Sequence, residues 1–211
     1  MLRITEIFLS LQGESTTTGL PTVFVRLTGC PLRCTYCDTA YAFSGGQHQS
    51  VEAVIDEVSN HHVNRVTVTG GEPLAQPECL NLLKELCDQG FAVSIETSGA
   101  LDIAGIDSRV TKVMDLKTPS SGEHERNLFS NISHLRRTDE IKFVISDRAD
   151  YDWTKSTINE HKLSQAAHLL VSPSHEQLHP RELAEWILED RLPVRLQIQL
   201  HKYLWGDVPG R

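Results

Sequence analysis

The sequence lacks any run of about 18 consecutive apolar residues, the length that a membrane-spanning helix needs. Its start, MLRITEIF, also lacks the basic segment followed by an apolar stretch that marks a secretory signal. Basic residues are in the minority, because 20 basic against 28 acidic side chains give a formal net charge of -8 at pH 7. Such a surface repels phosphate backbones. We therefore expect a cytoplasmic protein that binds neither membranes nor nucleic acid.

Cysteine is also scarce, and the 5 cysteines are too few and too unevenly spaced for a disulfide framework. Cys79 and Cys87 lie in ECLNLLKELCDQG, a helical pattern in which cysteine acts as a small buried apolar residue. The other three, Cys30, Cys34 and Cys37, crowd into TGCPLRCTYC. In a reducing compartment this grouping indicates metal or redox chemistry.

Strand-like and helix-like segments alternate along most of the chain, which favours an α/β fold with a parallel sheet. The predicted strands cover 22–27, 65–69, 91–97, 112–117, 140–146, 168–172 and 194–200. The predicted helices follow Ser50, span ECLNLLKELCDQ and PRELAEWILEDR, and more weakly occupy DYDWTKSTINEH. Segment 118–131 is rich in turn formers, so we predict a loop there, beside the site.

No linker or internal repeat divides the 211 residues, so we predict a single domain over 1–211. The pattern fits either an open doubly wound sheet or a partial barrel. We favour a shortened barrel of parallel strands, open on one side, because a complete eight-stranded barrel usually needs about 250 residues. In either architecture the carboxyl ends of the strands form the functional rim. Polar and glycine residues recur at these ends, in TGGE (69–72), ETSG (96–99), KTPS (117–120) and SPS (172–174).

Three thiols without a fourth nearby allow two interpretations. A tetrahedral structural zinc needs four protein ligands, and the nearest fourth candidate is His48. A four-iron cluster held by three thiolates instead keeps one iron without a protein ligand, which an outside amine and carboxylate can occupy. The C-x3-C-x2-C spacing after a strand, with Gly29 and Pro31 forcing a turn, suits the cluster.

The cysteine motif and VTVTGGEPL (66–74) together resemble the radical S-adenosylmethionine enzymes, in which a GGE motif reads the methionyl amine of the cofactor. Glycines allow close backbone approach, and Glu72 can complement an ammonium group. More narrowly, ITEIFLSLQGES, FVRLTGCPLRCTYCDT, ETSG, KTPSSGE and QLHK resemble the 7-carboxy-7-deazaguanine synthase family over most of the chain. An activase that makes a glycyl radical on a partner protein, and a non-enzymatic zinc module, are the alternative functions; the activases lack the LQGE and CDT context.

The resemblance implies a shortened radical S-adenosylmethionine core, a partial (β/α)6-type barrel. It implies a carbon–nitrogen lyase that converts 6-carboxy-5,6,7,8-tetrahydropterin to 7-carboxy-7-deazaguanine with loss of ammonia, on the route to queuosine and other 7-deazapurines of tRNA. The implied cofactors are a [4Fe-4S] cluster, S-adenosylmethionine and Mg²⁺. An external one-electron donor such as flavodoxin, and a homodimer that covers the open side of the barrel, are further expectations.

The resemblance also implies roles for individual residues. Cys30, Cys34 and Cys37 would ligate the cluster, and Thr39 would contact Mg²⁺. The implied substrate residues are Leu11, Gln12, Gly13, Glu14, Arg26, Thr69 and His201. The implied S-adenosylmethionine residues are Tyr36, Cys37, Asp38, Gly70, Gly71, Glu72, Asp115, Lys117 and Ser172. The chain departs from the family pattern at Asp115-Leu116-Lys117 and in the tail after Lys202.

Overall fold

The computed structural model describes residues 1–206, 208 and 210, and the tail residues Asp207, Pro209 and Arg211 lie outside them. The described chain forms one nine-stranded sheet in the order β3-β1-β2-β4-β5-β6-β7-β8-β9. From β2 onward, β4 to β9 continue the sheet in parallel, whereas β1 runs antiparallel to both β2 and β3. The strands are β1 (Leu2–Leu11), β2 (Pro21–Leu27), β3 (Gln47–Gln49), β4 (Arg65–Gly70), β5 (Ala92–Thr97), β6 (Thr111–Asp115), β7 (Glu140–Ile145), β8 (His168–Pro173) and β9 (Arg195–Leu196).

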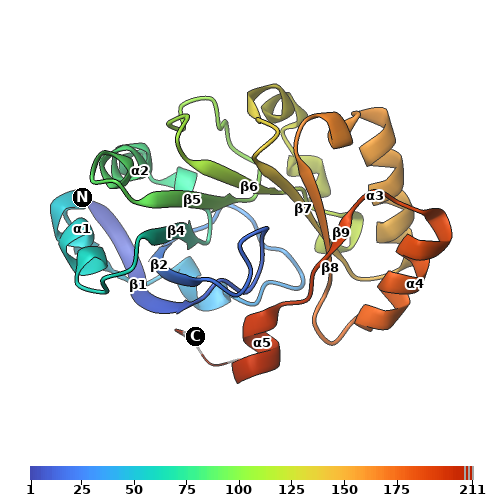
Figure 1. The fold of residues 1–211 in the computed structure, drawn as a ribbon, viewed down its shortest axis with the longest axis horizontal. Coiled ribbons are helices and arrows are strands. Elements are labelled where there is room, and N and C mark those ends of the chain that lie inside the picture. Colours follow the sequence, from blue (N-terminus) through green and yellow to red (C-terminus); the bar gives the residue numbers. More distant parts are fainter. Residues whose placement is uncertain (207, 209, 211) are drawn as a thin grey trace.

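Helices connect most of the parallel strands and pack their apolar faces on the sheet. They are α1 (Val51–Ser59), α2 (Glu78–Asp88), α3 (Arg148–Glu160) and α4 (Pro180–Asp190), whereas α5 (Leu200–Trp205) follows β9 and has no buried residue. Local sequence explains where they begin: the Ser50 side chain accepts the N–H of Ala53 to cap α1, Asp147 caps α3, and Pro180 opens α4. Figure 1 shows α1 and α2 toward one end of the curved sheet and α3 and α4 toward the other. No helix of the described residues is both long and apolar enough to span a membrane.

Two of the crossovers contain no α-helix. Residues 98–110 link β5 to β6 by turns, and β6 reaches β7 through three short 3₁₀ helices, Pro119–Ser121, His124–Arg126 and Phe129–His134. The loop predicted at 118–131 is therefore irregular, as expected, but is tightened by single helical turns. Because these two connections contain no α-helix, the barrel-like sheet fits into 211 residues.

The predicted strand at 194–200 is wrong over most of its length. Only Arg195–Leu196 pair with β8, and Leu200 already begins α5. The alternation in VRLQIQL serves loop contacts instead, because the Gln197 amide oxygen accepts the N–H of Ser15 at 2.9 Å and Leu200 N–H donates to Gly13 carbonyl at 3.1 Å. The prediction also missed β1 and β3.

The sheet curls into an open barrel whose edges, β3 and β9, do not pair with each other. The loop after β1 crosses this opening: Thr16 N–H contacts the carboxylate of Glu140 on β7 at 3.1 Å, and Ser15 reaches the segment after β9. The predicted α/β fold with a shortened, partial barrel is thus confirmed.

Candidate active site

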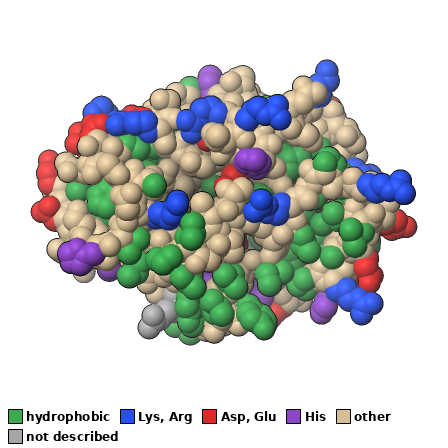
Figure 2. Space-filling model, in the orientation of Figure 1, with side chains coloured by type: hydrophobic (Ala, Val, Ile, Leu, Met, Phe, Trp, Pro, Cys, Tyr) green, Lys and Arg blue, Asp and Glu red, His purple; other side chains and the backbone are tan. Residues whose placement is uncertain are grey.

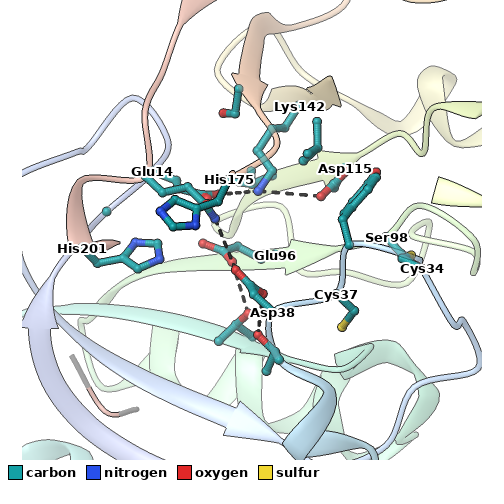
Figure 3. Close-up of a pocket in the computed structure, with 18 of the residues that line it drawn as sticks. Glu14, Cys34, Cys37, Asp38, Glu96, Ser98, Asp115, Lys142, His175 and His201 are labelled. Atoms are coloured by element: carbon teal, nitrogen blue, oxygen red, sulfur yellow. Dashed lines mark hydrogen bonds and ion pairs between the residues drawn. The ribbon is translucent and has the colours of Figure 1, made fainter. Parts of the chain in front are cut away.

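A cavity of about 520 Å³ lies at the carboxyl ends of the parallel strands, where the rim was predicted. Its wall combines the loop after β1, the cysteine loop after β2, the ends of β4, β5 and β6, and the segment around α5. Every residue predicted for the site lines this cavity except Glu72. Figure 3 shows the thiols of Cys34 and Cys37 on one side and the Glu14 and His201 side chains on the other. The cavity therefore has a sulfur end and a polar end.

The cysteine loop is fixed by contacts with the loop after β6. Thr35 N–H donates to the carbonyl of Ser121 at 3.0 Å, and the Thr35 hydroxyl donates to the carbonyl of Ser120 at 2.7 Å. Cys30, Cys34 and Cys37 are all free thiols and half-buried. Burial raises the pKa of Cys34 to about 11, against the opposing charge of Lys117. Since iron binds thiolates, cluster assembly must release protons from this loop.

The glycine pair at the end of β4 packs against the end of β2 and the start of the cysteine loop. Gly70 lies at φ +154°, and a Cβ there would sit 2.3 Å from the Leu27 carbonyl oxygen. A Cβ on Gly71 would sit 2.4 Å from the Gly29 carbonyl oxygen and 2.6 Å from the Cys30 Cβ. Only glycine permits this approach, so the motif positions the thiols as well as the cavity floor.

Glu72 is the exception among the predicted ligand residues. It is fully buried, and its carboxylate accepts hydrogen bonds from Leu74 N–H at 3.0 Å, Thr97 hydroxyl at 3.0 Å and Ser98 N–H at 2.7 Å. Glu72 does not line the cavity, and its predicted contact with a ligand ammonium stays a prediction. Because its oxygens are already satisfied, Glu72 holds the end of β5 against the turn after β4.

Three buried polar atoms in the cavity wall have no hydrogen-bond partner among the described residues: Tyr36 Oη, Asp115 Oδ1 and Ser172 Oγ. Buried polar groups are nearly always paired, so these three atoms suit a polar ligand in the cavity. Asp115 Oδ2 is held 3.0 Å from Lys117 Nζ, which orients the carboxylate. The carboxylate oxygen and the two hydroxyls, beside three thiols, fit a cluster together with a polar cofactor.

A single zinc ion fits less well. Among residues 1–206, 208 and 210, no three His, Cys, Asp or Glu side chains gather tightly enough to hold one metal ion. His48, the proposed fourth ligand, is exposed on edge strand β3 opposite Arg3 and does not line the cavity. A cluster spaces its thiolates around several irons and so tolerates the wider grouping.

The polar end is built around Glu14. Lys142 on β7 forms an ion pair with Glu14 Oε2, and Gln199 Nε2 donates to Glu14 Oε1 at 2.9 Å. Burial opposes the charge on Glu14, but the ammonium of Lys142 outweighs it and lowers the pKa of this carboxyl. The His201 ring packs on Gly13, where a Cβ would lie 2.1 Å from Nδ1. Burial lowers the pKa of His201 and favours its neutral form.

Glu96 adds a second carboxylate at the polar end. The Thr69 hydroxyl donates to Glu96 Oε2 at 3.2 Å. Burial raises the pKa of Glu96, and the nearby Glu14 adds to that effect. Glu96 therefore keeps its proton to a higher pH than an ordinary carboxyl group does, and a protonated carboxyl can donate a hydrogen bond as well as accept one.

Arg26 points into the cavity from β2, but part of its guanidinium is engaged. Its Nε lies 2.7 Å from Glu6 Oε1, and its Cζ lies 5.8 Å from the ring centres of Phe8 and Tyr41. Arg26 thus lines the cavity while Glu6 occupies the Nε side of its guanidinium.

Beyond the thiols, the hydroxyl of Thr39 donates to Asp38 Oδ1 at 2.9 Å. Asp38 Oδ2 lies 3.4 Å from Lys202 Nζ and 3.3 Å from Gln199 Nε2. Both residues line the cavity between its sulfur and polar ends, which is where an ion that contacts both ligands would bind.

The sequence analysis missed Lys142, Glu96 and Gln199 as site residues. Lys142 had a usable signal, because a lone lysine interrupts the apolar strand EIKFVIS in the way that Arg26 interrupts VFVRL. Gln199 had none, since it was assigned to a strand and its position depends on the start of α5.

Comparison with known proteins agrees with this geometry. The Radical SAM superfamily model matches residues 24–116, which include the cysteine loop and the glycine pair. Among solved structures, the crystal structure of QueE from Escherichia coli aligns with a TM-score of 0.73 at 22% identity, covering 95% of this chain and 94% of that one. Streptococcus suis SuiB bound to S-adenosylmethionine aligns with a TM-score of 0.55 at 15% identity, covering 81% of this chain and 44% of that one. The fold and the site together define a radical S-adenosylmethionine protein.

Sequence identity to curated proteins assigns the chain to a family within this class. The 7-carboxy-7-deazaguanine synthase of Chlorobaculum tepidum is 44% identical, covering 97% of this chain and 94% of the relative. That of Koribacter versatilis is 42% identical, covering 97% of both chains. The chain therefore belongs to the 7-carboxy-7-deazaguanine synthase family, as the sequence predicted.

Proposed function

We propose that the cavity converts 6-carboxy-5,6,7,8-tetrahydropterin to 7-carboxy-7-deazaguanine with loss of ammonia, with the cofactors at the sulfur end and the pterin at the polar end. The chain is a radical S-adenosylmethionine enzyme of 7-deazapurine biosynthesis by family membership. The observation that carries the spatial assignment is the meeting of three free thiols, three unpartnered polar atoms and the Glu14 cluster in one cavity.

At the sulfur end, Cys30, Cys34 and Cys37 would hold the [4Fe-4S] cluster, leaving one iron for S-adenosylmethionine. When bound and reduced, the cluster supplies the electron that cleaves this cofactor and so starts hydrogen-atom abstraction from the substrate. The backbone of Gly70 and Gly71 borders the cofactor space. Tyr36, Asp115 and Ser172 would bind its polar groups through their unpartnered atoms, and Asp38 and Lys117 complete the wall.

At the polar end, Gln12 and Glu14 would bind the amide edge of the pterin, since that edge offers both donors and acceptors. Leu11, Gly13, Thr69 and His201 line the same space. Because Glu6 takes the Nε side of Arg26, the fork that we assign to the substrate carboxylate is the Nη pair. Thr39 would place Mg²⁺ beside that carboxylate, since magnesium favours oxygen ligands.

Three further expectations belong to this proposal. One apolar cluster joins the strands to α1 through α4, which supports a single domain over 1–211. Apolar side chains gather on the lower part of the face in Figure 2, where α5 lies, and the exposed Tyr203 and Leu204 support a homodimer. An external one-electron donor such as flavodoxin would supply the electron.

Anaerobic reconstitution followed by a turnover assay tests the function. With carboxytetrahydropterin, reductant and S-adenosylmethionine, we expect 7-carboxy-7-deazaguanine by mass spectrometry, with the cofactor regenerated. Cys34→Ala should lose cluster and product together. A colourless protein with one zinc per chain would instead favour the zinc module. Cleavage of S-adenosylmethionine without formation of deazaguanine would favour the activase.

A further inference from the structure

Lys142 lies where the two ends of the cavity meet. It projects from the middle of β7 into the barrel, is only 8% exposed, and pairs with Glu14 Oε2. Its Nζ also lies 3.7 Å from Asp115 Oδ2, beyond hydrogen-bond distance. Figure 3 shows the ammonium between these two carboxylates. One side chain thus contacts the pterin end tightly and faces the cofactor end more loosely.

Carboxylates surround Lys142 and stabilise its charged form. Glu14, Glu96 and Asp115 all face its ammonium from different strands and loops. Burial opposes the charge on Lys142, yet these carboxylates outweigh it and keep the pKa of Lys142 well above its usual value. Removing the ammonium would leave the buried carboxylate of Glu14 without its ion-pair partner, close to that of Glu96, which is strongly unfavourable.

Each carboxylate partner is tied to a different ligand region. Glu14 is also held by Gln199 at the start of α5, so its orientation is linked to the loop that lines the pterin end. Asp115 is held by Lys117, and its Oδ1 lacks a partner at the cofactor end. A ligand that binds Glu14 or Asp115 therefore changes the balance of attraction on a shared ammonium.

We propose that Lys142 is a positioning residue that couples the two ends of the cavity, so that the pterin and S-adenosylmethionine each tighten the binding of the other. When a ligand donor engages Glu14, the ammonium is drawn less strongly to that side and moves toward Asp115, which orients Asp115 for the cofactor. The reverse holds by thermodynamic reciprocity. This inference rests on the proposed function, because it needs both ligands to bind in this cavity.

Binding without turnover tests it. On the reconstituted holoenzyme without reductant, calorimetry would measure the S-adenosylmethionine Kd with and without saturating carboxytetrahydropterin. In the unaltered protein we expect the pterin to lower the Kd of S-adenosylmethionine by about fivefold or more. In Lys142→Met the ratio of the Kd without pterin to the Kd with pterin should fall to about one, whereas each ligand alone should still bind. In Lys142→Met with Glu14→Gln, the ratio should fall no further, because both changes break one interaction.

Lys112 provides the matched control. It is also a buried lysine on a central strand, 4% exposed, with Nζ 3.4 Å from Asp139 Oδ2, but it does not line the cavity. Lys112→Met should lower thermal stability and leave the coupling ratio unchanged. Should Lys142→Met fail to fold, Asp115→Asn removes the other half of the interaction with little change in shape, and the same loss of coupling is expected.

The outcomes distinguish a failure of the proposed function from a failure of the coupling role of Lys142. If the holoenzyme binds neither ligand, the proposed function is wrong. If both bind and the ratio in Lys142→Met equals that of the unaltered protein, or Lys112→Met abolishes it equally, the coupling role of Lys142 is wrong while the function stands.

Discussion

Gly71 packs against Cys30 so closely that a side chain at position 71 would overlap the cysteine, with a hypothetical Cβ 2.6 Å from the Cys30 Cβ. The N–H of Glu72 also donates to the Gly29 carbonyl at 2.9 Å, so the glycine pair and the cysteine loop form one unit. Gly71 thereby limits where the Cys30 side chain can lie, although the two residues are far apart in sequence. The proposed cluster site therefore depends on the glycine motif through contact with the loop.

Gly71→Ala should reduce cluster retention. Overpacking of this kind costs about 1–3 kcal/mol, and here it falls on the cysteine loop. We expect less iron per chain after anaerobic reconstitution and desalting. Gly105→Ala is the control, because a Cβ there meets only the flexible tip of Leu80 at 3.1 Å. Equal iron content in both variants would contradict the prediction.

Glu72→Gln should destabilise the fold. The carboxylate accepts hydrogen bonds from Leu74, Thr97 and Ser98, and an amide nitrogen would face some of these donors. We expect a loss of about 1–3 kcal/mol in the free energy of unfolding, measured by urea denaturation. Glu189→Gln, on the exposed side of α4, should change stability little. An unaltered urea midpoint for Glu72→Gln would show that these bonds contribute nothing net.

Arg26→Lys should raise the KM for the pterin, because an ammonium cannot reproduce the planar fork. The loss of a charge-assisted hydrogen bond, about 1.5–3 kcal/mol, corresponds to a rise of roughly tenfold to a hundredfold. Steady-state kinetics under anaerobic conditions measure this effect. Arg65→Lys is the control, since Arg65 is exposed at the opposite end of the neighbouring strand β4. Unchanged kinetics in Arg26→Lys would remove the carboxylate clamp.

Thr39→Ala should weaken the response to magnesium while the cluster stays intact. The hydroxyl is fixed by Asp38 at 2.9 Å, so its loss removes one oriented oxygen from the cavity wall. We expect roughly tenfold more Mg²⁺ for half-maximal turnover. Thr39→Ser keeps the hydroxyl and should respond normally. The visible spectrum verifies the cluster, and an identical magnesium titration in Thr39→Ala would refute the assignment.

Asp139 should make the free energy of unfolding depend on pH in the acidic range. Burial opposes its charge, but hydrogen bonds from Arg136 and from Lys112 N–H outweigh it and lower the pKa of Asp139. The unfolded chain then binds more protons between this lowered pKa and about 4, so stability rises with pH across that window. The contribution is complete above about pH 4 and is lost as pH falls through the lowered pKa.

Asp139→Asn should therefore flatten the pH dependence of the unfolding free energy below about pH 4, measured by urea titrations at several pH values. It should also be less stable at neutral pH by about 3 kcal/mol or more. Asp56→Asn, exposed on α1, controls for the loss of one carboxylate. An unchanged acid slope in Asp139→Asn would assign the effect to other groups.

The sequence by itself determined the chemistry and the rim. Thiol spacing, the glycine pair and the polar residues at strand ends depend on local geometry, so they could be predicted before any contact was known. The tertiary structure alone decided which charges meet. Glu14 and Lys142 are 128 positions apart, and their pairing depends on how far the sheet curls. Likewise the Glu72 carboxylate accepts the N–H of Ser98, and Leu200 N–H donates to Gly13 where α5 begins, because distant partners rather than the local pattern decide these contacts.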